Sequence, residues 1–235
     1  MRLILRLEPM GNFSEDEIHS HQIQGLIYST LQETEIDFLH NRRLPKFLSF
    51  SNFFPLGPFK EGESKSIIIA SPIRHFVDVL KERLEGSTIF LGKYAFKVLE
   101  CKKFSPRISG NWITATPVIV RRSPKSDDYM STSKGDSELG ILKRIEENAI
   151  WKHKIFFNET PNLRRPIFAR ATLKKEVAVK VWLSSGRPHV FVGSLWELTV
   201  RRNLFRNRKF LSLIVDAGLG SFNSMGFGFV NTIIT

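Results

Sequence analysis

The order in which predicted strands and helices alternate constrains the fold of this 235-residue chain more than any other feature. Leucine recurs at every second position of residues 1–7, which predicts a strand. Ser14 and Glu17 form a capping box, which predicts a first helix that ends near Leu31. The chain therefore starts as a strand followed by a helix.

The rest of the first half continues this alternation. Ser71 followed by Pro72 predicts a helix start with a serine cap, and Gly86 predicts the end of that helix. The expected elements are a short second helix opened by Thr34 and Asp37, strands at 49–53 and 65–70, a helix at 71–84, and a strand at 87–100 with a hairpin through Gly92. The order strand, helix, strand, strand, helix, strand is the ferredoxin-like pattern.

The second half repeats this order of elements, although no residue-level repeat connects the halves. The expected elements are a strand at 113–120, a polar loop at 123–135, a helix at 137–151, strands at 177–183 and 190–200, a helix at 203–217 and a strand at 228–234. We therefore predict an α+β fold of two tandem ferredoxin-like, RRM-like domains, residues 1–101 and 111–235. Such sheets host many functions, so the function has to come from particular residues.

The net charge of +12 is concentrated in the second half of the chain. Up to Pro117 there are 15 Lys and Arg against 13 Asp and Glu, and from Val118 onward there are 20 against 10. A one-sided excess of this kind is typical of a protein that binds a polyanion, and nucleic acid is the expected partner. A solvated basic surface is the alternative.

Several protein classes are excluded by composition. Cys101 is the single cysteine, which excludes an internal disulfide framework and a cysteine-based zinc site. No stretch approaches the roughly 20 apolar residues of a membrane span, and no secretory signal is recognised. We expect a cytoplasmic protein with no membrane partner, no cofactor and no metal site.

A glycine-rich segment, residues 218–228, lies between the last predicted helix and the last predicted strand. Glycines permit positive φ, and the amide groups of such a turn can point at phosphate oxygens. The segment is not a dinucleotide fingerprint, because it follows a helix, and it lacks the Gly-Lys-Ser/Thr of a P-loop. A structural turn packed on the sheet is the alternative. The RNA-binding residues expected here are Gly218, Gly220, Ser221, Asn223, Gly226 and Gly228.

The segment has the pattern glycine, apolar, glycine, five residues, glycine, apolar, glycine. Together with a strand from Met1 and the run 23–28 on the first helix, it resembles the repeat-associated RNA-binding (RAMP) superfamily of CRISPR systems. More narrowly, the chain resembles the endoribonuclease that cuts the CRISPR precursor transcript within its repeats. The resemblance covers nearly the whole chain in element order.

This resemblance implies a concrete activity. Members have two ferredoxin-like domains, bind a repeat RNA that is often a short hairpin, and cut it once without a metal ion. The 2′-hydroxyl attacks the adjacent phosphate and leaves a 2′,3′-cyclic phosphate and a 5′-hydroxyl. The guide RNA then passes to an interference complex for antiviral defence. Whether this chain acts as a monomer or a homodimer stays open.

The resemblance also implies catalytic residues. Archaeal members use a tyrosine on the first helix, a histidine soon after it and a lysine six residues later, and Tyr28, His40 and Lys46 reproduce that order. Histidine suits proton transfer because its pKa lies near neutrality. Lys46, with Arg42 or Arg43, would stabilise the charged phosphorane. The alternative for His40 is a residue that interacts with the dipole at a helix end.

Basic residues before the glycine-rich segment are the remaining RNA-binding candidates. They would pair with phosphates, although any one of them is equally well explained as plain surface. They are Arg201, Arg202, Arg206, Arg208 and Lys209. A non-catalytic RNA-binding subunit of the same superfamily, or an unrelated basic RNA chaperone, are the alternatives to an enzyme.

Overall fold

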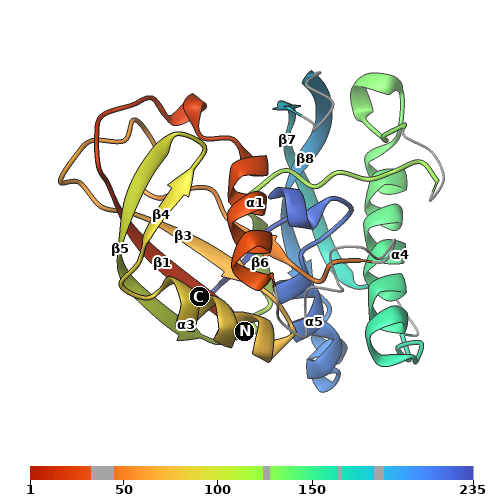
Figure 1. Ribbon diagram of the computed structural model, residues 1–235. Helices are drawn as coiled ribbons and strands as arrows, with labels where there is room; N and C mark the ends of the chain where they lie inside the picture. The colour runs from red at the N-terminus through yellow and green to blue at the C-terminus, as the bar shows by residue number, and fades with distance from the viewer. Residues whose placement is uncertain (33–44, 124–127, 164–165, 183–187, 235) are drawn as a thin grey trace.

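The structure is a computed structural model that describes residues 1–32, 45–123, 128–163, 166–182 and 188–234. Its strands form two sheets that lie side by side, each with its own helices (Figure 1). The predicted α+β class with two ferredoxin-like units is confirmed.

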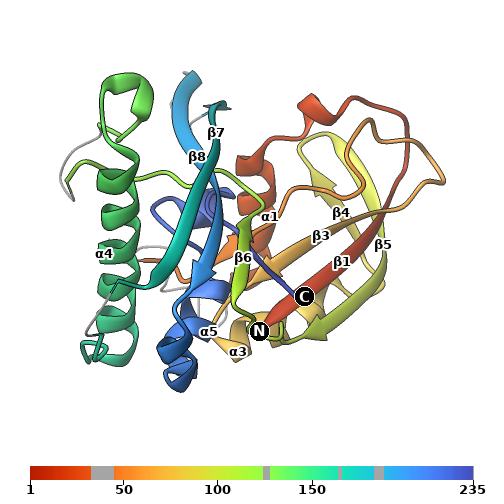
Figure 2. The ribbon, with the colours of Figure 1, turned by 180° about the vertical axis from the view of Figure 1, so that it is seen from behind.

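The first sheet has the strand order β2-β3-β1-β5-β4, and each neighbouring pair that contains β1 is antiparallel. Its elements are β1 (Arg2–Pro9), β2 (Ser49–Phe50), β3 (Lys65–Ala70), β4 (Thr88–Leu91), β5 (Tyr94–Phe104), α1 (Ser20–Leu31) and α3 (Arg74–Leu84). Seen from behind, β1 and β3 lie in front of α1 and α3, so both helices cover one face (Figure 2). The order is ferredoxin-like, with β4 as an additional edge strand.

The leucine alternation of the first strand fixes which face is covered. Leu3, Leu5 and Leu7 are at most 1% exposed and belong to the same core as Ile23 and Ile27 of α1. Successive side chains of a strand point to opposite faces, so the alternating leucines all meet the helices.

The second sheet has the order β7-β8-β6-β9, which is the ferredoxin-like order without additions. Its elements are β6 (Asn111–Thr114), β7 (Phe168–Trp182), β8 (Pro188–Val200), β9 (Val230–Ile233), α4 (Glu138–Phe157) and α5 (Arg208–Ala217). Four short 3₁₀ helices complete the described chain: η1 (Glu15–Glu17), η2 (Thr132–Lys134), η3 (Arg202–Arg206) and η4 (Asn223–Met225). Helix α4 lies on the outer flank of this sheet (Figure 1).

Two predicted helix starts are displaced. The capping box of Ser14 is present, but it caps η1, and α1 begins only after His19. Ser71 is not the N-cap of α3, because the helix starts after Ile73; the Ser71 hydroxyl donates to the carbonyl of Phe47 at 2.7 Å and accepts from the N–H of Ile73 at 3.1 Å. The predicted short second helix lies outside the described residues.

The predicted strand bounds of the second half were wrong in several places. The strand expected at 177–183 begins at Phe168, and its backbone pairs with β8 along its length. The sequence did not predict its first part, because exposed charged side chains such as Lys174 and Lys175 hide the hydrophobic pattern. The strand expected at 113–120 ends at Thr114, and the following stretch makes only isolated bridges. Smaller differences are the early end of β2 at Phe50, the extension of α4 to Phe157 and the start of β9 at Val230.

The helix predicted at 203–217 is interrupted. Residues of η3 form a separate 3₁₀ helix, and Asn207 accepts a hydrogen bond from the N–H of Phe210 at the start of α5. An asparagine at this position satisfies an N–H that has no partner within the helix. The chain therefore turns at Asn207 before α5 leads into the glycine-rich segment.

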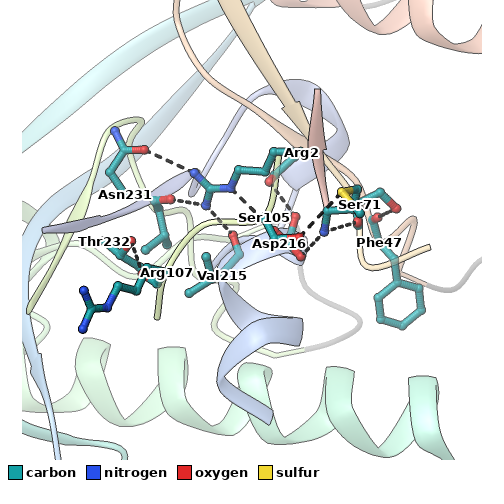
Figure 3. Close-up of polar contacts among 12 residues, drawn as sticks. Arg2, Phe47, Ser71, Ser105, Arg107, Val215, Asp216, Asn231 and Thr232 are labelled. Atoms are coloured by element: carbon teal, nitrogen blue, oxygen red, sulfur yellow. Dashed lines mark hydrogen bonds and ion pairs between the residues drawn. The ribbon is translucent and has the colours of Figure 1, made fainter. Parts of the chain in front are cut away.

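Arg2 connects β1 to the second half of the chain. The side chain is 2% exposed, and its Nη2 donates to the carbonyl oxygens of Val215 at 3.0 Å and Val230 at 2.6 Å. Its Nη1 donates to Oδ1 of Asn231 at 3.3 Å, and its Nε lies 3.5 Å from Oδ1 of Asp216 (Figure 3). One buried guanidinium thus holds β1 against both α5 and β9.

Candidate nucleic-acid interface

The glycine-rich segment lies where the sequence predicts it, between α5 and β9. Its glycines 218, 220, 226 and 228 all have positive φ. The requirement is most severe at Gly228, where an added Cβ would lie 1.9 Å from the carbonyl oxygen of Leu219. Only a glycine fits so close to a backbone oxygen, so this position is dictated by packing within the segment.

Several backbone amide groups of the segment donate hydrogen bonds to carbonyl groups of the protein. The N–H of Leu219 donates to the carbonyl of Gly228 at 2.9 Å, and the N–H of Gly228 donates to that of Pro117 at 2.8 Å. The N–H of Ser221 donates to the carbonyl of Ile119 at 2.8 Å. These three amides tie the segment to its neighbours and are not directed at a ligand.

The accessible part of the segment is its middle. Gly218, Gly220, Asn223 and Gly228 are buried, whereas Ser221, Phe222, Ser224, Met225 and Gly226 are half-buried. RNA contact by the whole predicted set stays a prediction, and the half-buried residues are the ones that a ligand can reach directly. Phe222 has φ 60°, uncommon for an aromatic residue, and the Arg121 guanidinium lies 4.5 Å from its ring centroid.

The first helix meets this segment. On α1, Nε2 of Gln24 donates to Oγ of Ser224 at 3.2 Å, although the two residues are 200 positions apart in sequence. Burial raises the pKa of Tyr28, and hydrogen bonds to Ser224 and Gln24 oppose that rise. The predicted catalytic tyrosine and the glycine-rich segment are therefore neighbours in space, although they lie near opposite ends of the chain.

Only part of the predicted catalytic set can be placed. Lys46 is half-buried, and burial lowers its pKa from the usual lysine value. The next residue, Phe47, packs edge-on against Phe156 of α4 with 4.9 Å between ring centroids, so this stretch crosses to the second half of the molecule. His40, Arg42 and Arg43 lie outside the described residues.

The basic candidates before the glycine-rich segment form a separate surface. Arg202 and Arg206 lie on η3, and Arg208 and Lys209 lie in the first turn of α5; all four side chains are exposed, while Arg201 is half-buried. The ten residues of α5 separate this surface from Gly218 by about 15 Å. A groove of about 470 Å³ beside Arg208 and Lys209 also includes Arg74 of α3, which the sequence did not single out.

Comparison with known proteins settles the family. Residues 100–232 match the family described as "CRISPR associated protein Cas6, C-terminal". The chain belongs to the Cas6 family. A relative from Methanocaldococcus jannaschii, "CRISPR-associated endoribonuclease Cas6 2", is 38% identical over 99% of this chain and 100% of its own. A Haloferax mediterranei "CRISPR-associated endoribonuclease Cas6" is 27% identical over 99% of this chain and 94% of its own.

Solved structures agree with the fold of the Cas6 family. The structure titled "CRISPR associated protein Cas6" has a TM-score of 0.73 at 18% identity, and the alignment covers 100% of this chain and 99% of the other. The structure titled "An RAMP protein binding different RNA substrates" also has a TM-score of 0.73 at 18% identity, with full coverage of both chains. The predicted resemblance to the CRISPR repeat-processing endoribonucleases is confirmed by the family match and by the curated relatives.

Two further observations concern ligands and membranes. Within the described ranges, no group of three or more His, Cys, Asp or Glu side chains is placed to hold a metal ion. Across the same ranges, none of the helices combines the length and apolar character needed to cross a membrane.

One buried residue of this Cas6 chain was missed from the sequence. Lys152 of α4 is 3% exposed and lies beneath the glycine-rich segment. It shares the buried face of α4 with Ile141, Ile145 and Ala149. A lysine on the apolar stripe of an amphipathic helix is the signal that could have identified it.

Proposed function

We propose that this protein binds CRISPR repeat RNA and cleaves the precursor transcript within the repeat, by attack of a 2′-hydroxyl on the adjacent phosphate and without a metal ion. The observation that carries the proposal is the contact between α1 and the glycine-rich segment, which brings Tyr28 to Ser224. Family membership and the endoribonuclease names of its relatives support the same activity.

Tyr28 acts as a hydrogen-bond donor in this proposal. A tyrosine phenol is protonated at neutral pH, and burial raises the pKa of Tyr28 further, so its O–H can donate to a phosphate oxygen. Donors directed at the oxygens that gain charge in the phosphorane stabilise the transition state more than the substrate.

Lys46 and His40 supply the remaining chemistry. Lys46, with Arg42 or Arg43, balances the negative charge of the phosphorane, and His40 transfers a proton to or from the reacting oxygens. Partial burial of Lys46 strengthens its interaction with a phosphate, because the surroundings screen the charge less than water does.

RNA binding extends over two surfaces in this proposal. The accessible residues of the glycine-rich segment hold the backbone near the cut, and the basic surface of η3 and α5 binds phosphates farther along. Residues 1–101 and 111–235 act as the two domains of the cytoplasmic enzyme. As a monomer or a homodimer, it delivers the guide RNA to an interference complex.

A single cleavage assay tests the enzyme. The protein is incubated in EDTA with the CRISPR repeat RNA of its own organism, and in parallel with the same RNA carrying a 2′-deoxy residue at the cut site. We expect one cut in the unmodified RNA, with a 2′,3′-cyclic phosphate end, and none in the modified RNA. An uncut natural repeat would leave the non-catalytic RNA-binding subunit as the function, and cutting of the deoxy RNA would exclude the proposed nucleophile.

His40 is tested in the same assay. We expect His40→Ala to slow the cut by about 10²- to 10⁴-fold, the usual contribution of a general acid or base, while RNA affinity is retained. A normal rate in that variant would remove His40 from the site.

A further inference from the structure

Lys152 donates three hydrogen bonds to the glycine-rich segment, two to backbone carbonyls and one to a side-chain oxygen. Its Nζ donates to the carbonyl oxygens of Gly218 and Gly220, both at 2.8 Å, and to Oδ1 of Asn223 at 2.5 Å. A lysine ammonium has three N–H donors, so all of its donors find acceptors in one short segment.

The buried charge of Lys152 is balanced by these oxygens. Within the described part of the chain, no carboxylate lies within ion-pair distance of this ammonium. Burial lowers the pKa of Lys152, and the three acceptor oxygens oppose this by stabilising the protonated form. An isolated buried ammonium is costly unless it is hydrogen-bonded, and the three oxygens supply that compensation.

Asn223 extends the same network across the segment. While its Oδ1 accepts from Lys152, its Nδ2 donates to the carbonyl oxygens of Leu219 at 2.8 Å and Phe227 at 2.9 Å. The beginning and the end of the segment are thus fixed to one another through a single amide. A helix outside the segment holds both of them in place.

The residues that this network positions are the accessible ones. Ser221, Phe222, Ser224 and Met225 lie between the fixed ends, and Ser224 reaches Gln24 and Tyr28 of α1. A segment rich in glycine has more conformations to lose than an ordinary loop, so its shape needs such support.

We propose that Lys152 is a positioning residue for RNA binding, which holds the glycine-rich segment in its RNA-binding conformation before the RNA arrives. This inference rests on the proposed function. When a binding-competent conformation is populated only in part, the apparent Kd rises by the inverse of that fraction. Once RNA is bound, the segment has the same conformation with or without the lysine, so the rate of cleavage at saturating RNA is preserved.

The test compares two lysines on one helix. Lys152→Met keeps the stem of the side chain and removes the three donors, and Lys154→Met makes the same change at an exposed position of α4. Three quantities are measured: the Kd for repeat RNA with a 2′-deoxy residue at the cut site, the single-turnover rate at saturating natural repeat, and amide hydrogen exchange of residues 218–228.

We expect Lys152→Met to raise the Kd about 10- to 100-fold, with the saturated rate within about threefold of the original protein. Amide exchange should accelerate in residues 218–228 and stay unchanged in β1 and β3. Lys154→Met should change none of these quantities beyond about threefold, because it tests the loss of one exposed charge.

Specific results would overturn the inference. A Kd for Lys152→Met equal to that of Lys154→Met, or unchanged exchange in residues 218–228, would show that the segment does not depend on this lysine. A saturated rate reduced as much as the affinity would assign Lys152 to the chemistry instead of to positioning. If Lys152→Met does not fold, Lys152→Gln replaces it, because glutamine keeps a polar end but lacks the charge and the length of the lysine side chain. The same expectations and the same contradicting results apply.

Failure of the proposed function is distinguishable from failure of this inference. If the original protein neither binds nor cuts the repeat, the proposed function is wrong, and the exchange measurement still shows whether Lys152 holds the segment. If the original protein cuts the repeat and the two methionine variants behave alike, only the role of Lys152 is wrong.

Discussion

Replacing Gly228 by alanine provides a quantitative test of the packing in the glycine-rich segment. Gly228 has φ +68°, and an alanine Cβ would lie 1.9 Å from the carbonyl oxygen of Leu219. Gly135 has φ +85° and nothing within 4 Å of the corresponding position. Gly135→Ala therefore measures backbone strain alone, and Gly228→Ala measures strain together with a collision.

The expected cost differs between the two sites. An L-residue in the left-handed region costs about 1–2 kcal/mol, which is the whole effect at Gly135. At Gly228 the backbone must also move, which disrupts the hydrogen bonds from Leu219 N–H to Gly228 and from Gly228 N–H to Pro117, of 2.9 and 2.8 Å. Each buried group left unpaired costs about 1–3 kcal/mol, so with two such groups and the backbone strain we expect about 5–6 kcal/mol in total.

Thermal unfolding followed by circular dichroism measures the difference. For a chain of this size, 1 kcal/mol corresponds to about 2–4 °C, so Gly135→Ala should lower Tm by about 2–8 °C and Gly228→Ala by about 10–24 °C. Equal shifts at the two sites would refute the reasoning, because the collision with Leu219 would then carry no energy.

Three further predictions concern other parts of the molecule. Arg2→Met should lower the free energy of unfolding in urea by about 3–5 kcal/mol, because it removes one member of a buried charged network. Arg6→Met, at an exposed position of β1, should change it by less than about 0.5 kcal/mol, and equal losses would contradict the role of Arg2. Tyr28→Phe should slow single-turnover cleavage by about 10- to 100-fold with an unchanged Kd, and an unchanged rate would remove the phenol from the site. Burial raises the pKa of Cys101 from 9.0 to about 11, so the native thiol should resist Ellman's reagent at pH 8 and react in urea. Because the unfolded chain loses this proton at lower pH than the folded chain, Cys101 should also reduce stability as pH rises from 9.0 to about 11, a loss that Cys101→Ala should remove.

Local patterns in the sequence were sufficient for most elements. The leucine alternation of β1 and the hairpin turn at Gly92 depend on residues that are close in sequence, and both appear where they were predicted. The pattern failed where tertiary pairing overrides local preference. The first half of β7 carries Lys174 and Lys175 on an exposed face, and only pairing with β8 makes it a strand.

The residues of the candidate site were predicted from local patterns, whereas their contacts depend on tertiary packing. The sequence identified the glycine-rich segment and Tyr28 separately, and it placed them at opposite ends of the chain. Their contact through Ser224 depends on how α1 packs against the second half of the molecule, which no local pattern encodes. The basic residues from Arg201 to Lys209 were predicted as RNA contacts because they precede the glycine-rich segment in sequence, and the length of α5 places the two surfaces apart.

The sequence by itself determined the order of strands and helices, the superfamily, and the glycines that a tight turn requires, because each depends on residues that are neighbours along the chain. The tertiary structure alone decided that Lys152 is buried beneath the glycine-rich segment and that Arg2 joins β1 to α5 and β9. From sequence alone, a lysine or arginine side chain is expected at the surface, because the hydrogen-bond acceptors that would allow its burial are not known. The acceptors of Arg2 come within reach only when the two halves of the chain pack together. Those of Lys152 come within reach only when α4 packs against the glycine-rich segment.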